Sequence, residues 1–216
     1  MKRFVINLKR RPDRLEQFFT RCPYPRECIN VIEAFDGKFQ ENESKKEKKY
    51  IPKFSNNRLR PGEIGVFISH LRIWKKMVND NIPIAMIFED DAQFDEKFYE
   101  FMETLSIPEH VNLLYFGGRF NKNFTIPPYA MEPVNDKIYK HITEPWDMRL
   151  HERTAHGYII TSRMAKFFIS AFDIYDNDVA VLDFFMIHVL KRLNIPYHST
   201  YPLVCWSPMV GDSDIR

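Results

Sequence analysis

The sequence is poor in glycine: its 216 residues include seven glycines and fourteen prolines. Average usage of about 7% would give roughly fifteen glycines. The chain has neither Gly-x-x-x-x-Gly-Lys-Ser/Thr nor Gly-x-Gly-x-x-Gly, the two glycine-rich loops that hold phosphates through backbone amides. Any phosphate site in this protein must therefore be built in another way.

Charge of one sign and long apolar runs are also scarce. The chain has 31 basic and 29 acidic residues, a net charge of +2, which is too small to predict nucleic-acid binding. No apolar run approaches the ~20 residues of a membrane helix. The apolar start, 4–8, is interrupted by charge before it reaches the length of a signal-peptide core. We expect a cytoplasmic protein with no membrane span and no nucleic-acid partner.

Cysteine is rare as well. Cys22, Cys28 and Cys205 show no metal-binding spacing such as Cys-x-x-Cys. A disulfide between Cys22 and Cys28 is one reading, and three free thiols in a reducing compartment is the other. We expect free thiols.

The chain is rich in residues that can form a core: 44% of its residues are hydrophobic and 15% are aromatic. The length suits one domain, which we take to be 1–216. Apolar runs that suit strands alternate with segments of helical periodicity, so we predict a Rossmann-like α/β/α sandwich with a mostly parallel central sheet. The expected strands are 4–8, 28–35, 84–88, 111–116, 138–142, 157–161 and 197–205. The expected helices are 13–19, 61–78, 95–105, 162–172 and 178–190.

The segment 40–57 differs from the rest of the chain because most of its first half is charged or polar. Its lysines alternate with acidic residues, which favours a solvated segment over a functional basic patch. We expect an exposed, mobile loop or a frayed helix.

Three carboxylates, Glu89, Asp90 and Asp91, directly follow the apolar run 84–88. This places them at the carboxyl end of a central strand, where open α/β sheets bind ligands. Adjacent carboxylates repel one another, and a divalent ion relieves that repulsion. Oxygen ligands suit Mg²⁺ or Mn²⁺, which commonly link carboxylates to substrate phosphates. The alternative is a solvated acidic turn.

Two other groups of polar residues follow the first two expected strands. Asn7, Arg10 and Arg14 follow the first, where arginines could contact a diphosphate; an ordinary charged helix start is the alternative. Asp36 follows the second and could accept a hydrogen bond from a ribose or a base, or belong to a plain turn.

Two glycines, Gly62 and Gly65, flank Glu63 at the expected start of a helix. Glycine allows a ligand to approach the backbone closely. Ser69 and His70 follow within that helix. A lone helix histidine such as His70 is more often held by its neighbours than used as a ligand.

Taken in order, these motifs resemble glycosyltransferase family 25, which includes lipooligosaccharide and procollagen galactosyltransferases. The resemblance covers most of the chain. It is carried by Val5-Ile6-Asn7-Leu8, Asp13-Arg14, Gly62-Glu63-Ile64-Gly65, Ser69-His70, Trp74, Glu89-Asp90-Asp91, Gly157-Tyr158-Ile159-Ile160, Asp183, Pro202-Leu203 and Ser213-Asp214-Ile215.

The resemblance implies a GT-A fold and inverting transfer of a hexose from a UDP-sugar to a hydroxyl group. The hexose would be of the galactose or glucose type, and the acceptor a glycan or the hydroxylysine of a collagen-like protein. The acidic triplet stands in the place of the metal-binding motif, so the expected ligands of Mn²⁺ (or Mg²⁺) are Asp91, Glu89 and Asp214. The expected donor-binding residues are Asn7, Leu8, Arg10, Arg14, Asp36, Glu63, Ser69, Glu89 and Asp90.

Inverting transfer needs a general base, and the candidate is Asp183 at the start of the last helix. An aspartate favoured there by the helix dipole is the alternative. Asp147 and Glu144, near Trp146, are the reserve candidates. His156 and the terminal run 212–214 could close over the diphosphate.

Two other functions remain open. A metal-dependent phosphodiesterase or nuclease also uses carboxylates at a strand end. A degenerate UDP-sugar-binding module would keep the donor site without acceptor chemistry. The short chain and the lack of a C-terminal Lys-Asp-Glu-Leu signal point to a bacterium or a virus-infected host cell as the source.

Overall fold

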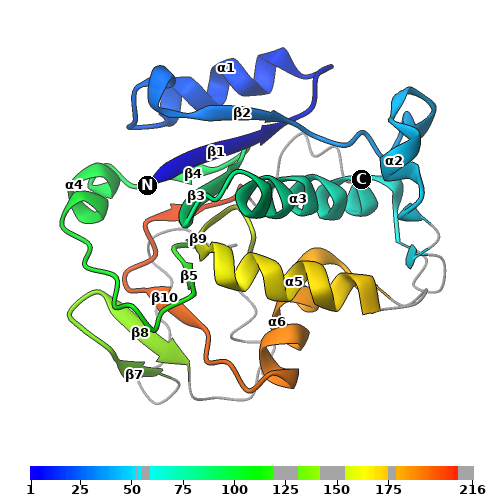
Figure 1. The fold of residues 1–216 in the computed structure, drawn as a ribbon. Helices are drawn as coiled ribbons and strands as arrows, with labels where there is room; N and C mark the ends of the chain where they lie inside the picture. The colour runs from blue at the N-terminus through cyan, green and yellow to red at the C-terminus, as the bar shows by residue number, and fades with distance from the viewer. Residues whose placement is uncertain (52, 55–58, 119–130, 142–153, 175–178, 209–216) are drawn as a thin grey trace.

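A central β-sheet with helices on both faces organises the computed structural model of the chain (Figure 1). The structure describes residues 1–51, 53–54, 59–118, 131–141, 154–174 and 179–208. Within this part of the chain, the main sheet has eight strands. Their order across the sheet is β2 (Asn30–Glu33), β1 (Lys2–Asn7), β3 (Ile84–Glu89), β9 (Gly157–Thr161), β5 (Leu113–Tyr115), β10 (His198–Thr200), β8 (Ile138–His141) and β7 (Met131–Pro133).

Six of these eight strands point the same way, which confirms the predicted α/β sandwich with a mostly parallel sheet. The strands β9 and β8 run against the others. β9 lies between β3 and β5 and pairs antiparallel with both. A second sheet in the described part of the chain has the order β4 (Gln93–Phe94), β11 (Cys205–Trp206) and β6 (Gly117–Gly118).

Helices on the two faces bury the sheet in two apolar clusters. One face packs against α3 (Pro61–Asn79), α5 (Ser162–Ile174) and α6 (Leu182–Arg192), which lie together in Figure 1. The other face packs against α1 (Pro12–Arg21) and α4 (Phe98–Glu103). Successive side chains of a strand alternate between faces. Accordingly, Phe4 and Ile6 of β1 belong to the first cluster, and Val5 between them to the second.

Several element boundaries differ from the prediction. The last expected strand, 197–205, is divided, because β10 joins the main sheet and β11 joins the small one. The expected helix 178–190 begins at Leu182. All three cysteines carry free thiols, as expected. No helix within the described ranges combines the length and apolar character needed to cross a membrane.

The segment 40–57 was expected to be an exposed loop or a frayed helix, and the expected exposure is wrong for part of it. It holds the 3₁₀ helix η2 (Gln40–Asn42) and the short helix α2 (Lys45–Lys48). Tyr50 and Phe54 are buried in the first apolar cluster. Two aromatic side chains therefore anchor a segment whose charge suggested full solvation. Its mobility stays a prediction.

Candidate functional site

The acidic triplet lies where β3 ends, between β1 and β9, at the expected carboxyl edge of the sheet. Glu89 is the last residue of β3, and the backbone turns directly after it, with the Ala92 amide donating to the Glu89 carbonyl at 3.2 Å. The turn 89–92 therefore presents three carboxylates at one edge of the sheet. Their side chains have different partners.

Asp90 is held by the first strand and the first helix. The Asn7 amide nitrogen donates to Asp90 Oδ2 at 2.7 Å, and the Arg14 guanidinium pairs with Asp90 Oδ1. Arg21 donates to the backbone carbonyl oxygens of Asp90 at 3.0 Å and Ala92 at 3.3 Å. Burial raises the pKa of Asp90 to about 6, although Arg14 and Asn7 act to lower it. These contacts make Asp90 an internal anchor of the turn.

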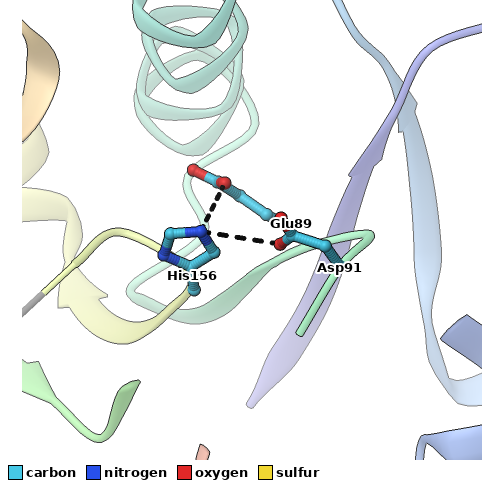
Figure 2. A group of neighbouring side chains, drawn as sticks. All are labelled: Glu89, Asp91 and His156. Atoms are coloured by element: carbon cyan, nitrogen blue, oxygen red, sulfur yellow. Dashed lines mark ion pairs between the residues drawn. The ribbon is translucent and has the colours of Figure 1, made fainter. Parts of the chain in front are cut away.

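Glu89 and Asp91 face a histidine instead (Figure 2). His156 Nε2 lies 3.4 Å from Glu89 Oε2 and 3.6 Å from Asp91 Oδ1. One ligand atom from each residue can be chosen so that all three lie within 4.8 Å of one another. Among the described residues, the buried Asp91 Oδ1 has no hydrogen-bond partner. Two carboxylates and an imidazole, with one carboxylate oxygen that has no hydrogen-bond partner, fit the ligand chemistry of a divalent cation.

The direction of β9 brings His156 to the carboxylates. Because β9 runs antiparallel to β3, its first residue, Gly157, lies opposite Phe88 near the end of β3. The Glu89 amide donates to the His156 carbonyl at 3.3 Å, which continues this pairing by one residue. A residue that precedes β9 therefore meets residues that follow β3. His156 was expected only as a residue closing over a diphosphate.

His70 contributes to the same cluster from α3. Trp74 Nε1 donates to the Tyr158 hydroxyl oxygen at 3.1 Å, and that hydroxyl lies 2.8 Å from His70 Nδ1. If the hydroxyl donates to Nδ1, His70 carries its proton on Nε2, which faces Glu89 Oε1 at 3.3 Å. The opposite tautomer would place a lone pair against the carboxylate. His70 is thus a second contact of Glu89, a role that its helical spacing did not indicate.

Burial and charge act in opposite directions on these carboxylates. Burial acts to raise the pKa of Glu89. The His156 charge and the His70 hydrogen bond outweigh this effect and lower the pKa from its ordinary 4.5 to about 2. The pKa of Asp91 is raised, because burial and the Glu89 charge outweigh His156. A bound cation would favour the ionised form of both groups.

A cleft of about 600 Å³, including its open mouth, lies beside the acidic turn. The turn 89–91 forms one wall, α3 contributes Gly62, Gly65 and Val66, and the loop 34–38 after β2 forms another wall. Most of the sequence-predicted donor residues line it: Asn7, Leu8, Arg10, Arg14, Asp36, Ser69, Glu89 and Asp90.

The loop 34–38 packs closely against α3. The Ser69 hydroxyl accepts from the Phe35 amide at 2.8 Å and donates to the Gly65 carbonyl at 2.6 Å. A Cβ at Gly37 would lie 1.6 Å from the Pro61 carbonyl oxygen, so only glycine fits there. On the cleft side, Arg10 Nε donates to Asp36 Oδ2 at 2.6 Å. Ser69 thus holds the cleft wall, and Arg10 and Asp36 form an ion pair on it.

The structure places Glu63 away from the cleft lining. Its Oε2 accepts from the Arg60 backbone amide at 2.7 Å, and its Oε1 accepts from the Arg60 side chain at 3.2 Å. This is a capping interaction of the first turn of α3. The flanking glycines suggested a ligand contact, but the position three residues into the helix explains the glutamate.

Asp183 lies in the first turn of α6, outside the cleft. Its Oδ1 accepts from the Ala155 amide at 3.0 Å, which ties it to the residue before His156. Burial raises the pKa of Asp183, while the His156 charge acts to lower it. The candidate base is therefore coupled to the metal-site candidates. The reserve candidates Glu144 and Asp147, their neighbour Trp146, and the terminal Asp212 and Asp214 lie outside the described residues.

Curated proteins similar to this chain carry glycosyltransferase names. Procollagen galactosyltransferase 1-A of Xenopus laevis is 34% identical over 180 residues, 78% of this chain and 28% of the relative. Procollagen galactosyltransferase 2 of Mus musculus is 34% identical over 102 residues, 44% of this chain and 16% of the relative. Inactive glycosyltransferase 25 family member 3 of Homo sapiens is 32% identical over 108 residues, 47% of this chain and 18% of the relative. The chain thus matches less than a third of the length of these relatives.

A solved structure and a family model complete the comparison. The crystal structure of residues 1–349 of TarS from S. aureus is similar with a TM-score of 0.43 and 12% identity, over 96% of this chain and 60% of that one. The family model described as glycosyltransferase family 25 (LPS biosynthesis protein) matches residues 1–186. This match covers well over half of the sequence, and the chain therefore belongs to glycosyltransferase family 25.

Proposed function

We propose that this chain is a metal-dependent, inverting glycosyltransferase of the GT-A type that uses a UDP-sugar. The observation that carries the proposal is the group Glu89, Asp91 and His156, with one unpartnered carboxylate oxygen, beside a cleft that contains arginines. A protein that transfers a sugar from a nucleoside diphosphate must stabilise the negative charge of the departing diphosphate. A bound Mn²⁺ or Mg²⁺ would supply that stabilisation.

Different residues of the cleft would bind different parts of the donor. Arg10 and Arg14 line the cleft and can donate to diphosphate oxygens. Asp36 lies on the opposite wall, where its carboxylate can accept from a ribose or base hydroxyl or amide. Glu89, Asp91 and, beyond the described residues, Asp214 are the proposed metal ligands. Asp90 contributes by fixing the turn through Asn7 and Arg14.

We assign the role of general base to Asp183. A base must accept the proton of the acceptor hydroxyl as the new bond forms. The raised pKa of Asp183 makes it a stronger base than an ordinary aspartate once it is ionised. Its bond to the Ala155 amide orients the carboxylate next to the metal-site candidates. Its position outside the cleft lining leaves the cleft itself for the donor.

The names of the relatives suggest the remaining chemistry. Two are procollagen galactosyltransferases, and the family description names LPS biosynthesis. We therefore propose a hexose of the galactose or glucose type as the transferred sugar. The acceptor would be a hydroxyl group of a glycan or of hydroxylysine in a collagen-like protein.

Calorimetry with UDP tests the donor site. Wild-type protein should bind UDP more tightly with Mn²⁺ than without it, and Asp91→Ala should abolish this metal-dependent binding while remaining folded. Asp80→Ala is the matched control, because Asp80 is an exposed aspartate paired with Lys76 at the far end of α3. Unchanged UDP affinity with Mn²⁺ in Asp91→Ala would overturn the proposal.

A second function, donor binding without transfer, is favoured by one observation: a similar human protein bears the name inactive. Release of UDP from UDP-galactose and UDP-glucose separates the two functions. A transferase should release UDP faster when an acceptor is added. Release that is slow and independent of every acceptor in a panel of glycans and collagen peptides would support the binding module.

A further inference from the structure

Arg72 of α3 joins three segments that are distant in the sequence. Its Nη1 donates to the Glu33 carbonyl at the end of β2, at 2.6 Å. Its Nη2 donates to Glu43 Oε2 and to Glu47 Oε2, each at 2.7 Å, and its Nε donates to Glu47 Oε1. One guanidinium therefore connects the helix, the strand end and the charged segment that follows. The planar fork of arginine suits this arrangement, whereas a lysine offers a single point charge.

Glu43 extends this connection to the cleft. While its Oε2 accepts from Arg72, its Oε1 accepts from the backbone amide of Asp36 at 2.6 Å. Asp36 belongs to the loop 34–38 that forms a cleft wall, and its side chain pairs with Arg10. An unbroken set of charge-assisted hydrogen bonds thus runs from Arg72 through Glu43 to the backbone of the cleft wall.

The same loop is held from its other side by α3 itself. Ser69, three residues before Arg72 on α3, accepts from the Phe35 amide. Gly37 packs against the Pro61 carbonyl. The residues on either side of Asp36 are therefore fixed to the helix, and Glu43 fixes Asp36 from the segment that follows. The loop is attached at three consecutive residues.

Burial distinguishes this ion-pair group from an ordinary surface pair. The side chains of Arg72 and Glu43 are 21% and 12% exposed, whereas those of Arg26 and Glu16, an arginine–glutamate pair of the same kind, are 55% and 64% exposed. Exposed pairs contribute little to structure because water and salt screen them. A pair largely withdrawn from water holds its geometry more firmly.

We propose that Arg72 and Glu43 are positioning residues of the donor cleft, which hold the Asp36 wall in the conformation that binds the nucleoside diphosphate of the sugar donor. The inference rests on the proposed function, because it takes the cleft to be the donor site. The inference also gives the charged segment after β2 a role. Glu43 of that segment holds the Asp36 backbone, and Glu47 holds Arg72.

The effect of losing the brace should appear in donor affinity. A wall that moves must be ordered again when the donor binds, and the free energy of that ordering is subtracted from binding. Even a misplacement of about 1 Å, caused by a substitution far from the reacting atoms, can lower a catalytic rate about 100-fold. We expect Arg72→Lys and Glu43→Ala to weaken UDP binding on the order of tenfold.

Two measurements on the full chain test the inference. Calorimetry with UDP and Mn²⁺ gives both the Kd and the fraction of protein that binds. Amide hydrogen exchange over residues 34–38 reports whether the loop opens more readily. The matched controls are Arg26→Lys, which alters an exposed arginine–glutamate pair, and Glu16→Ala, which removes it; neither should change either quantity.

The expected result is a raised Kd at an unchanged binding fraction, with faster exchange confined to the loop 34–38. A lower binding fraction with an unchanged Kd would mean that the brace only supports folding, and would overturn the positioning role while the proposed function stands. Glu43→Ala, which leaves Arg72 on Glu47, keeps the test open if Arg72→Lys fails to fold. Wild-type protein that binds no UDP would overturn the proposed function and, with it, this inference.

Discussion

The two walls of the cleft differ in how far their charged groups are compensated by partners within the protein. On the wall formed by the turn 89–91, Glu89 and Asp91 face each other across His156, and Asp91 Oδ1 has no hydrogen-bond partner among the described residues. On the wall formed by the loop 34–38, the Asp36 carboxylate pairs with Arg10 and its amide with Glu43. The difference supports the proposal that the acidic turn binds a cation, while the loop wall is held by contacts within the protein.

This contrast separates the proposed metal-binding carboxylates from residues, such as Glu43 and Arg72, that hold the backbone of the cleft wall. Charged groups packed together without full compensation reduce the stability of a fold and are typical of functional sites. Compensated groups such as Arg72 and its glutamates stabilise a conformation. Substitutions on the two walls should therefore change stability with opposite sign, although substitutions on both should weaken donor binding.

The largest expected effect concerns the chemistry next to the acidic wall. Asp183→Asn keeps an oxygen that can accept from the Ala155 amide but removes the ability to take up a proton. Transfer should fall on the order of 100-fold or more, the usual contribution of a general base. UDP affinity measured by calorimetry should not change. Transfer that survives in this variant would exclude Asp183 as the base.

The next largest effect is a loss of stability on the loop side. Arg72→Ala leaves Glu43 and Glu47 without their shared partner in a partly buried place. We expect the free energy of unfolding to fall by about 2 kcal/mol, between the values for exposed and for buried pairs. Urea denaturation measures this loss, with Arg26→Ala as the exposed control. Equal losses in the two variants would remove the distinction between the brace and a surface pair.

A smaller effect of opposite sign is expected on the acidic side. Asp91→Asn removes one of the two adjacent buried charges without changing the size of the side chain. In metal-free buffer the free energy of unfolding should rise by up to about 1 kcal/mol, because asparagine avoids the cost of burying a charge and the repulsion from Glu89. The added stability that wild-type protein gains from Mn²⁺ should disappear. A variant that is instead less stable without metal would show that the contacts of Asp91 with His156 and Arg14 outweigh the repulsion and the cost of burial.

The smallest effect is a dependence on pH. Burial acts to raise the pKa of Glu47, but the hydrogen bonds from Arg72 lower it below its ordinary 4.5. Stability from a lowered carboxyl pKa is present above the unfolded value and is lost as pH falls through the folded value. The stability difference between wild type and Glu47→Gln, below about 1 kcal/mol near neutral pH, should shrink as pH falls below 4.5. Urea titrations between pH 7 and pH 3 measure it, and a constant difference would contradict the pairing.

The acidic turn could be located from the sequence because one strong signal determines it. The run 84–88 is apolar throughout, so a buried strand had to end at Glu89, and its carboxyl edge is where such sheets bind ligands. The different partners of the three carboxylates could not be predicted from the sequence. Asp90 turns toward Asn7 and Arg14, whereas Glu89 and Asp91 face His156. Arg14 also lies 3.5 Å from Asp91 Oδ2. That division depends on tertiary partners.

Two contacts were not predicted, for related reasons: the approach of His156 to the carboxylates, and the brace that Arg72 forms with Glu43 and Glu47. His156 reaches the carboxylates because β9 runs antiparallel between β3 and β5, and strand direction has no local signal in residues 157–161. The glutamates of the segment 40–49 alternate with lysines, which is typical of a solvated surface. Only the position of Arg72 on the facing helix gives Glu43 and Glu47 a shared partner. Pairs distant in sequence are set by the fold and not by composition.

The contact between Gly37 and the start of α3 limits how this cleft could be redesigned. Any side chain at Gly37 would collide with a backbone carbonyl, and one at Gly65 would lie 2.7 Å from the Phe35 carbonyl oxygen. A side chain at either glycine would therefore force the loop away from the helix and disturb the wall of the cleft. A change in donor preference would have to come from side chains that enter the cleft, such as Val66 on α3 or Lys38 at the end of the loop. Libraries built at these two positions would leave the close packing of Gly37 and Gly65 intact.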